Sequence, residues 1–233
     1  MPLPKIATPK YQLTIPSSKK KVTFRPFLMK EQKVLMMAME GKNDADVLRA
    51  MCDIIVSCVD GIDNIDTMPM FDVEYIFAQL RAKSVGENVD VRIKCPKCNV
   101  RNDVSVQIDT IEVVFPEQAS NKIMLNENLG IILKYPSLSD RKPDPKKINT
   151  DEAFKFICDS IEMVFDNETT YTRKDFTADE INEFILSMSA EQFEKIAKFY
   201  ESLPYLNKQI DCKCIGCQHE FKVDFRGLQD FFT

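Results

Sequence analysis

Two Cys-x-x-Cys motifs constrain the fold of this 233-residue chain more than any other feature. The first supplies Cys95 and Cys98 in "KCPKC", and the second supplies Cys214 and Cys217 in "KCIGC". Each motif lies between two segments of alternating apolar and polar residues, a pattern that predicts a strand, a turn and a strand. Such hairpins, called zinc knuckles, direct two thiolates toward one point, and Zn²⁺ takes four ligands in a tetrahedron. The two motifs therefore predict one zinc site in a split zinc ribbon.

Two separate redox motifs are the competing interpretation. A thioredoxin-like motif has its first Cys at the start of a helix, where the helix dipole lowers the pKa of the thiol. Both motifs here lie between expected strands instead, which favours the shared metal site. Because four Cys ligands leave no open position for a catalytic water, we expect the Zn²⁺ to be structural.

The ligand set leaves two alternatives open. Cys212 lies two residues before Cys214 on an expected strand and points the same way, so it could replace one ligand. His219, the only histidine, follows Cys217 by two residues and could also coordinate. We favour a spare thiol for Cys212 and a surface position for His219. The remaining cysteines lie in helical patterns and are expected to be buried: Cys52, Cys58 and Cys158.

Composition limits the classes of function. With 44% hydrophobic and 29% charged residues and a net charge of −5, the sequence is typical of a soluble globular protein and unfavourable for non-specific nucleic-acid binding. No signal-peptide pattern and no bilayer-length apolar stretch is found, so we expect a reducing cytoplasm, where clustered cysteines bind metal. One histidine, no phosphate-binding Gly loop and no Ser elbow argue against an enzyme.

Nucleic-acid binding by a zinc ribbon is the alternative function. The first motif carries Lys94, Lys97 and Arg101, which could contact phosphates. The second motif, in "CIGCQHEFKVD", is nearly neutral, and the acidic balance of the whole chain argues against this alternative.

The expected elements follow from periodicity and turn signals. A hairpin is expected over 11–27, and helices and further strands are expected after it. The helices are 28–41, 44–61, 70–86, 150–165, 177–188 and 189–203, and the strands are 88–94, 103–109, 122–125, 130–135 and a strand–turn–strand over 207–225.

Three local expectations are specific enough to test. Asp44 is expected to cap the second helix, and Thr177 and Ser189 to open capping boxes with the residues three positions later. The Met-rich stretch 35–39 is expected to pack in the core, with a partner-binding surface as the alternative.

The expected fold class is α+β, with an N-terminal β-hairpin and two helical groups joined by the split zinc ribbon. The segments, expected to form one interlocked unit, are an N-terminal hairpin and helical region (1–94), the first knuckle and a β-hairpin region (95–135), a linker rich in proline and charge (136–149), a C-terminal helical region (150–205), and the second knuckle with the C-terminal tail (206–233).

Two stretches resemble a known family. "MPLPKIATPKYQLTIPSSKKKVTFRPFLMKEQKVL" and "FDVEYIFAQLRAKSVGENVDVRIKCPKC" are similar to the T4-like bacteriophage baseplate hub assembly family. The resemblance is good over roughly the first hundred residues and beyond them covers only the overall plan. It implies a late viral protein that acts without catalysis in building the hub, either as a subunit or as an assembly chaperone.

This resemblance also implies partners and a location. The partners would be other phage baseplate hub proteins, with no specific nucleic acid and no membrane insertion. The chain would work in the cytoplasm of the infected host cell and could be retained in the tail baseplate of the virion. Because exposed aromatic and Arg side chains commonly anchor interfaces, the candidate contacts are Arg25, Phe27, Arg81, Phe231 and Phe232. The alternative is local packing, with Phe27 in the core of the hairpin, Arg81 paired with Glu74 or Glu87, and the C-terminal tail against the second knuckle.

Overall fold

The structure, a computed structural model, describes residues 7–41, 43–140 and 150–227. It combines helices with antiparallel sheets, which confirms the mixed helix-and-sheet class. The chain divides into two units, one formed by Met1–Val114 with Tyr205–Thr233 and the other by Phe115–Pro204. The second unit is thus an insertion in the sequence of the first. The expected linker 136–149 falls within the range of the second unit, not at its ends.

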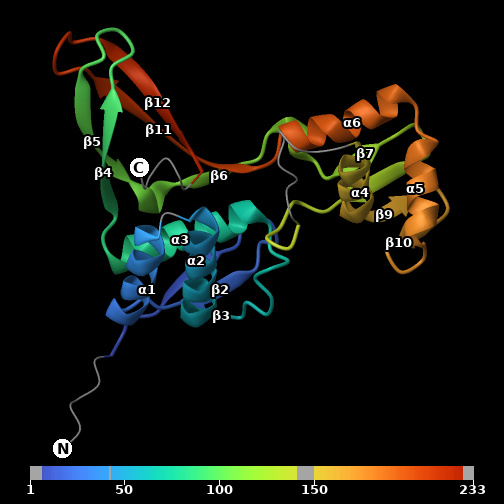
Figure 1. Cartoon of the computed structure of the whole chain (residues 1–233), viewed down its shortest axis with the longest axis horizontal. Coiled ribbons are helices and arrows are strands. Elements are labelled where there is room, and N and C mark those ends of the chain that lie inside the picture. The colour runs from blue at the N-terminus through green and yellow to red at the C-terminus, as the bar shows by residue number, and fades with distance from the viewer. Residues whose placement is uncertain (1–6, 42, 141–149, 228–233) are drawn as a thin grey trace, which may run out of the picture. The chain divides into compact units, whose positions relative to one another are not determined.

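The first unit begins with the predicted hairpin. β1 (Tyr11–Thr14) and β2 (Lys21–Phe24) pair antiparallel, so the expectation for 11–27 is confirmed. β3 (Val59–Asp60) adds a third strand beside β2 (Figure 1). This short strand follows directly on a helix, whereas the sequence pattern had extended that helix to residue 61.

Three helices follow β2 in the first unit: α1 (Met29–Glu40), α2 (Asp44–Cys58) and α3 (Met70–Ser84). α3 has the predicted inward face, since its apolar positions are almost inaccessible to solvent: Val73, Ile76, Phe77 and Leu80.

The expected cap of α2 is wrong by one residue. Asn43, in extended conformation, accepts a hydrogen bond at Oδ1 from the Ala45 N–H at 3.1 Å, so Asn43 is the N-cap. Asp44 is already helical and contributes its negative charge to the first turn, where the helix dipole favours it.

The expected burial of the Met-rich stretch 35–39 is also wrong. Met36, Met37 and Met39 are between 47% and 61% exposed. The inward side of α1 is instead formed by Glu31, which is buried, and by the half-buried Leu35. These two positions are one helical turn apart and mark the inward side of α1, and the methionines that follow Leu35 lie away from that side, toward solvent.

The buried carboxylate of Glu31 accepts hydrogen bonds from Arg25, Leu28 and, at 3.4 Å, the Ser57 hydroxyl. The Arg25 guanidinium donates to Oε1 at 2.8 Å, and the Leu28 N–H donates to Oε2 at 2.8 Å. Arg25 also donates to the Ser57 carbonyl at 3.2 Å, and so links β2, α1 and α2. Burial by itself raises the pKa of Glu31, but the hydrogen bonds from Arg25 and Leu28 outweigh it and lower the pKa to about 2.

Two long hairpins complete the first unit. β4 (Asn88–Lys94) pairs with β5 (Arg101–Gln107), and β11 (Tyr205–Lys213) pairs with β12 (Glu220–Arg226). The 3₁₀ turn η1 (Ile108–Thr110) and β6 (Glu112–Val114) follow β5, and β6 pairs with the start of β11. The two hairpins are therefore joined at their base by backbone hydrogen bonds.

The second unit contains a four-stranded antiparallel sheet in the order β10-β9-β8-β7. Its strands are β7 (Lys122–Met124), β8 (Gly130–Leu133), β9 (Ile161–Phe165) and β10 (Thr170–Thr172), with the 3₁₀ turn η2 (Glu117–Ala119) before them. The predicted β7–β8 hairpin is confirmed. Gly130 is required in β8 because a Cβ there would overlap the ring of Phe165 on β9.

Three helices belong to the same unit: α4 (Thr150–Ser160), α5 (Ala178–Leu186) and α6 (Ala190–Glu201). Both capping boxes, at Thr177 and Ser189, are confirmed. The helix expected over 150–165 is wrong after Ser160, because Ile161–Phe165 pairs with β8 as β9. The core of the unit combines side chains from the sheet and from α6, among them Ile131, Leu133, Ile161, Ile196 and Phe199.

Replacement of Glu31 tests the ion pair that links β2, α1 and α2. Glu31→Gln should lower the free energy of unfolding at pH 7 by about 1–3 kcal/mol, because the half-buried Arg25 loses its charged partner. Since the folded pKa lies below the ordinary value of about 4.3, this contribution is present above that value and is lost as the pH falls toward 2.

Urea denaturation at pH 7 and pH 3 measures both effects. The control is Asp90→Asn, which removes an exposed carboxylate from the same unit. A Glu31→Gln deficit that did not shrink in acid would contradict the assignment.

Candidate metal centre

The first Cys motif forms a tight turn between β4 and β5. The Cys95 N–H donates to the Val100 carbonyl at 2.9 Å, and the Asn99 N–H donates to the Cys95 carbonyl at 2.9 Å. Asn99 has φ 59°, a left-handed conformation that asparagine tolerates. The Lys97 N–H lies 3.4 Å from the Cys95 sulfur, so the backbone of the turn is directed at the thiol.

The second motif repeats this turn position by position. The Cys214 N–H donates to the His219 carbonyl at 2.9 Å, and the Gln218 N–H donates to the Cys214 carbonyl at 3.0 Å. Gln218 has φ 58°, matching Asn99. The Gly216 N–H lies 3.4 Å from the Cys214 sulfur. Two unrelated stretches of sequence thus adopt the same local geometry around their first cysteine.

The two turns meet, and their four sulfurs form one cluster. The Sγ atoms of Cys95, Cys98, Cys214 and Cys217 all lie within 4.8 Å of one another. The shortest separations join one turn to the other: 3.7 Å between Cys95 and Cys217, and 3.4 Å between Cys98 and Cys214. A tetrahedron with Zn–S bonds of about 2.3 Å has S–S edges of about 3.8 Å. All four cysteines are free thiols, so donor type and spacing both fit a tetrahedral metal ion.

Two of the clustered thiols have pKa values shifted in opposite directions. Hydrogen bonds from the Cys217 and Gly216 N–H groups lower the pKa of Cys214 to about 6. At Cys98 the Val100 N–H acts to lower the pKa, but burial and the neighbouring thiols raise it to about 12. One thiolate therefore suppresses ionisation of its neighbour, and a bound dication would remove that conflict.

Asn102 joins the two turns through its side chain. Its Oδ1 accepts a hydrogen bond from the Ile215 N–H at 2.9 Å, and its Nδ2 donates to the Val100 carbonyl at 2.9 Å. Asn102 is only 3% exposed. The turns also pack closely, since a Cβ on Gly216 would lie 3.1 Å from a methyl group of Val100. Asn102 thus positions the second motif against the first.

The role of Asn102 was missed in the sequence analysis, although the strand pattern contains a signal. In β5 it has the same parity as Val104 and Val106, the apolar positions of that strand. A polar residue at an inward position must satisfy its hydrogen bonds inside the protein, which distinguishes Asn102 from the exposed polar residues of the strand.

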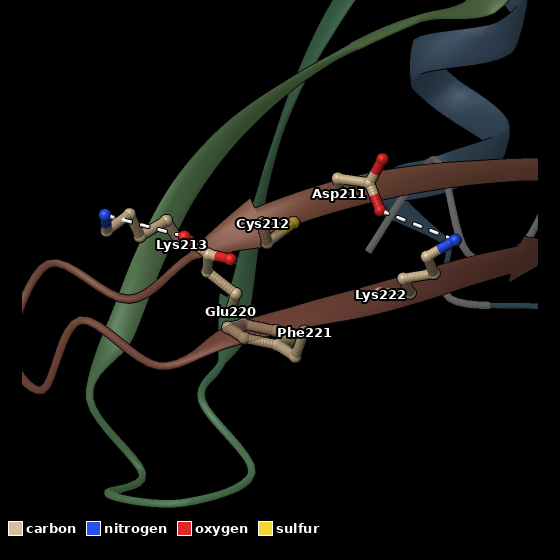
Figure 2. Close-up of a pocket in the computed structure, with 6 residues that line it drawn as sticks. All are labelled: Asp211, Cys212, Lys213, Glu220, Phe221 and Lys222. Atoms are coloured by element: carbon tan, nitrogen blue, oxygen red, sulfur yellow. Dashed lines mark ion pairs between the residues drawn. The ribbon is translucent and has the colours of Figure 1, made fainter.

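Neither alternative ligand lies in the cluster found among the described residues. Cys212 is buried on β11 opposite Phe221, where both line a separate pocket of about 390 Å³ (Figure 2). The ring of His219 stacks on Phe221, with centroids 6.1 Å apart and planes 13° from parallel.

Two ion pairs also line this pocket: Lys213–Glu220 at 3.6 Å and Lys222–Asp211 at 3.8 Å (Figure 2).

The candidate partner contacts occupy different environments. Arg25 is engaged by Glu31, and Phe27 is only 6% exposed, so neither offers a free surface anchor. Arg81 is half-buried on α3, and burial lowers its pKa. Phe231 and Phe232 lie outside the described residues.

Comparison with protein families identifies the class of protein. The family model described as "T4 bacteriophage base plate protein" matches residues 8–233, and the chain belongs to this family. No curated protein and no solved structure matches the chain. Membership suggests a structural role in a phage baseplate, in contact with other phage structural proteins. None of the helices in the described parts of the chain is long and apolar enough to span a membrane.

Asn102 provides a test of the junction between the turns. Asn102→Ala should lower the free energy of unfolding by about 1–3 kcal/mol, because it leaves the Ile215 N–H without its acceptor and removes one of the two donors to the Val100 carbonyl. Amide hydrogen exchange at Ile215 should rise at the same time. Asn88→Ala, at an exposed position of β4, is the matched control and should change neither quantity. Unchanged exchange at Ile215 in the Asn102 variant would count against the bridge.

Proposed function

We propose that this chain acts without catalysis in assembly of the phage baseplate hub, as a structural subunit or an assembly chaperone, and that a structural zinc stabilises it. The observation that carries the metal part is the cluster of four sulfurs, and family membership supports the baseplate part. The proposed zinc ribbon consists of the β4–β5 and β11–β12 hairpins, with Cys95, Cys98, Cys214 and Cys217 as ligands.

Zinc is the metal that these donors favour. A shell of four thiolates suits Zn²⁺, and complete occupation by protein ligands leaves no position for a reacting water. The metal would therefore act on stability rather than on chemistry. With a single histidine in the chain, which stacks on Phe221, acid–base catalysis by imidazole finds no support either.

The proposed zinc would act over an unusual distance along the chain. Its ligands at 95–98 and 214–217 are separated by the whole inserted unit, Phe115–Pro204. Closing so long a loop costs conformational entropy in folding, and metal binding contributes free energy that offsets this cost. We infer that metal binding favours docking of the C-terminal segment, which follows the inserted unit, onto the rest of the first unit.

The proposed partners are other hub proteins, encountered in the cytoplasm of the infected host late in infection. Membership of a phage baseplate family supports this part of the proposal. Lys94, Lys97 and Arg101 are exposed near the first turn, but they belong to a chain with a net charge of −5.

Metal analysis tests the zinc site directly. Purified chain should contain one Zn²⁺ per molecule by elemental mass spectrometry. Cys95→Ser and Cys214→Ser should each lose the metal and lower the melting temperature by 10 °C or more, about the effect of losing several kcal/mol in a domain of this size. Cys212→Ser is the matched control and should keep both metal and stability. Full metal in either ligand variant would refute the shared site, and iron in place of zinc would refute the choice of metal.

Infection experiments test the baseplate role. An amber mutation in the gene for this chain should block baseplate formation, and a suppressor host should restore it. Mass spectrometry of purified virions then separates the two forms of the proposal: a fixed ratio to other tail proteins indicates a subunit, and presence in lysate alone indicates a chaperone. Normal baseplates without the chain would overturn the proposed role. Salt-sensitive retention on DNA would support the nucleic-acid alternative instead.

A further inference from the structure

α1 presents large apolar side chains to solvent. Methionine makes up most of them, and its flexible side chain adapts to irregular contacts. The exposed fractions are 42% for Leu28, 78% for Met29, 48% for Val34, 52% for Met36, 61% for Met37 and 47% for Met39. Apolar patches rimmed by polar residues commonly mark interaction surfaces.

The centre of this face is a regular stripe. It consists of Met29, Lys33, Met36, Met37 and Glu40, which follow the i, i+4, i+7, i+8, i+11 spacing of one helix face and are all exposed. The subset at 29, 33, 36 and 40 has the alternating spacing of four and three residues found where two helices pack along a seam. α2 lies beside α1 (Figure 1), and this stripe faces away from the buried side of α1.

Charge order along the stripe favours one kind of partner. Lys33 lies toward the start of α1 and Glu40 at its end, with Met36 and Met37 midway between them. In an antiparallel pair centred between the two methionines, Lys33 of each copy lies opposite Glu40 of the other, and Met36 lies opposite Met37. A parallel pair would instead place like charges together.

Both charged side chains are available for such contacts. In the described ranges 7–41, 43–140 and 150–227, neither Lys33 nor Glu40 takes part in an intramolecular ion pair. The macrodipoles of two antiparallel helices also favour the arrangement, since each positive end lies beside a negative end.

We propose that the exposed stripe of α1 binds a second copy of this chain in a symmetric, antiparallel helix pair. Such an interface uses the same surface twice and closes on itself as a dimer. One helix from each copy buries an area at the small end of specific interfaces, so the dimer forms in a concentration-dependent equilibrium. The inference rests on α1 alone and is independent of the zinc site and of the baseplate role.

Sedimentation equilibrium of the full-length chain tests this proposal. The wild type should shift from one chain to two as its concentration rises through the micromolar range. Lys33→Glu and Glu40→Lys should each weaken dimerisation about tenfold or more, because two attractive pairs become two repulsive ones. The double variant Lys33→Glu/Glu40→Lys should restore it, since the charges complement each other again.

Two further variants separate the apolar contribution from a general loss of exposed apolar surface. Met36→Ser/Met37→Ser should abolish the dimer. Leu186→Ser removes a side chain that is 64% exposed on α5 and should leave dimerisation unchanged. Circular dichroism confirms that each variant is folded.

Three outcomes would overturn the inference. The wild type could remain a single chain throughout, or the single charge reversals could leave the dimer intact, or the double variant could fail to restore it. A monomeric wild type that binds another baseplate protein, with binding lost in Met36→Ser/Met37→Ser, would assign the stripe to that partner instead of a second copy.

Discussion

The convergence of four sulfurs at the tips of two hairpins is the constraint on which the first unit depends. β4–β5 and β11–β12 are joined at their base by the pairing of β6 with β11, and Lys208 on β11 donates to the Thr110 hydroxyl at 2.6 Å. At the opposite end they are joined by the cysteine cluster and by Asn102. The pair of hairpins is therefore anchored at both ends, although the whole second unit separates them in sequence.

A second interaction, between Arg25 and Glu31, holds together the N-terminal hairpin, α1 and α2. Arg25 and Glu31 form a partly buried ion pair that joins the terminal hairpin to α1 and α2. The hydrogen bond from Arg25 is the larger cause of the low pKa of Glu31, and the Leu28 N–H at the start of the helix adds to it. Because Glu31 faces inward, the methionines of α1 face outward. The orientation of α1 about its axis therefore accounts for both the internal ion pair and the exposed apolar surface.

The errors of the sequence analysis have identifiable physical reasons. Over 150–165 the apolar spacing suits a helix, yet Ile161 and Val164 are β-branched and find a partner strand in β8, so tertiary pairing overrides the local pattern. For 35–39, hydrophobicity alone indicated burial. The ion pair between Glu31 and Arg25 determines which side of α1 faces the core. Because Arg25 lies outside α1, the residue pattern of α1 alone does not reveal this.

Local chemistry alone determined much of this protein. Hairpins, capping boxes and the inward face of α3 follow from spacing, because each depends on neighbours within a few residues. The four clustered cysteines are far apart in sequence, and they could be identified because the same Cys-x-x-Cys motif between two alternating segments occurs twice. Tertiary structure decided what depends on distant partners: Asn102 bridging the two turns, Cys212 and His219 lying outside the cluster, and the exposure of α1. These outcomes depend on which segments meet in space, and no short stretch of sequence records that.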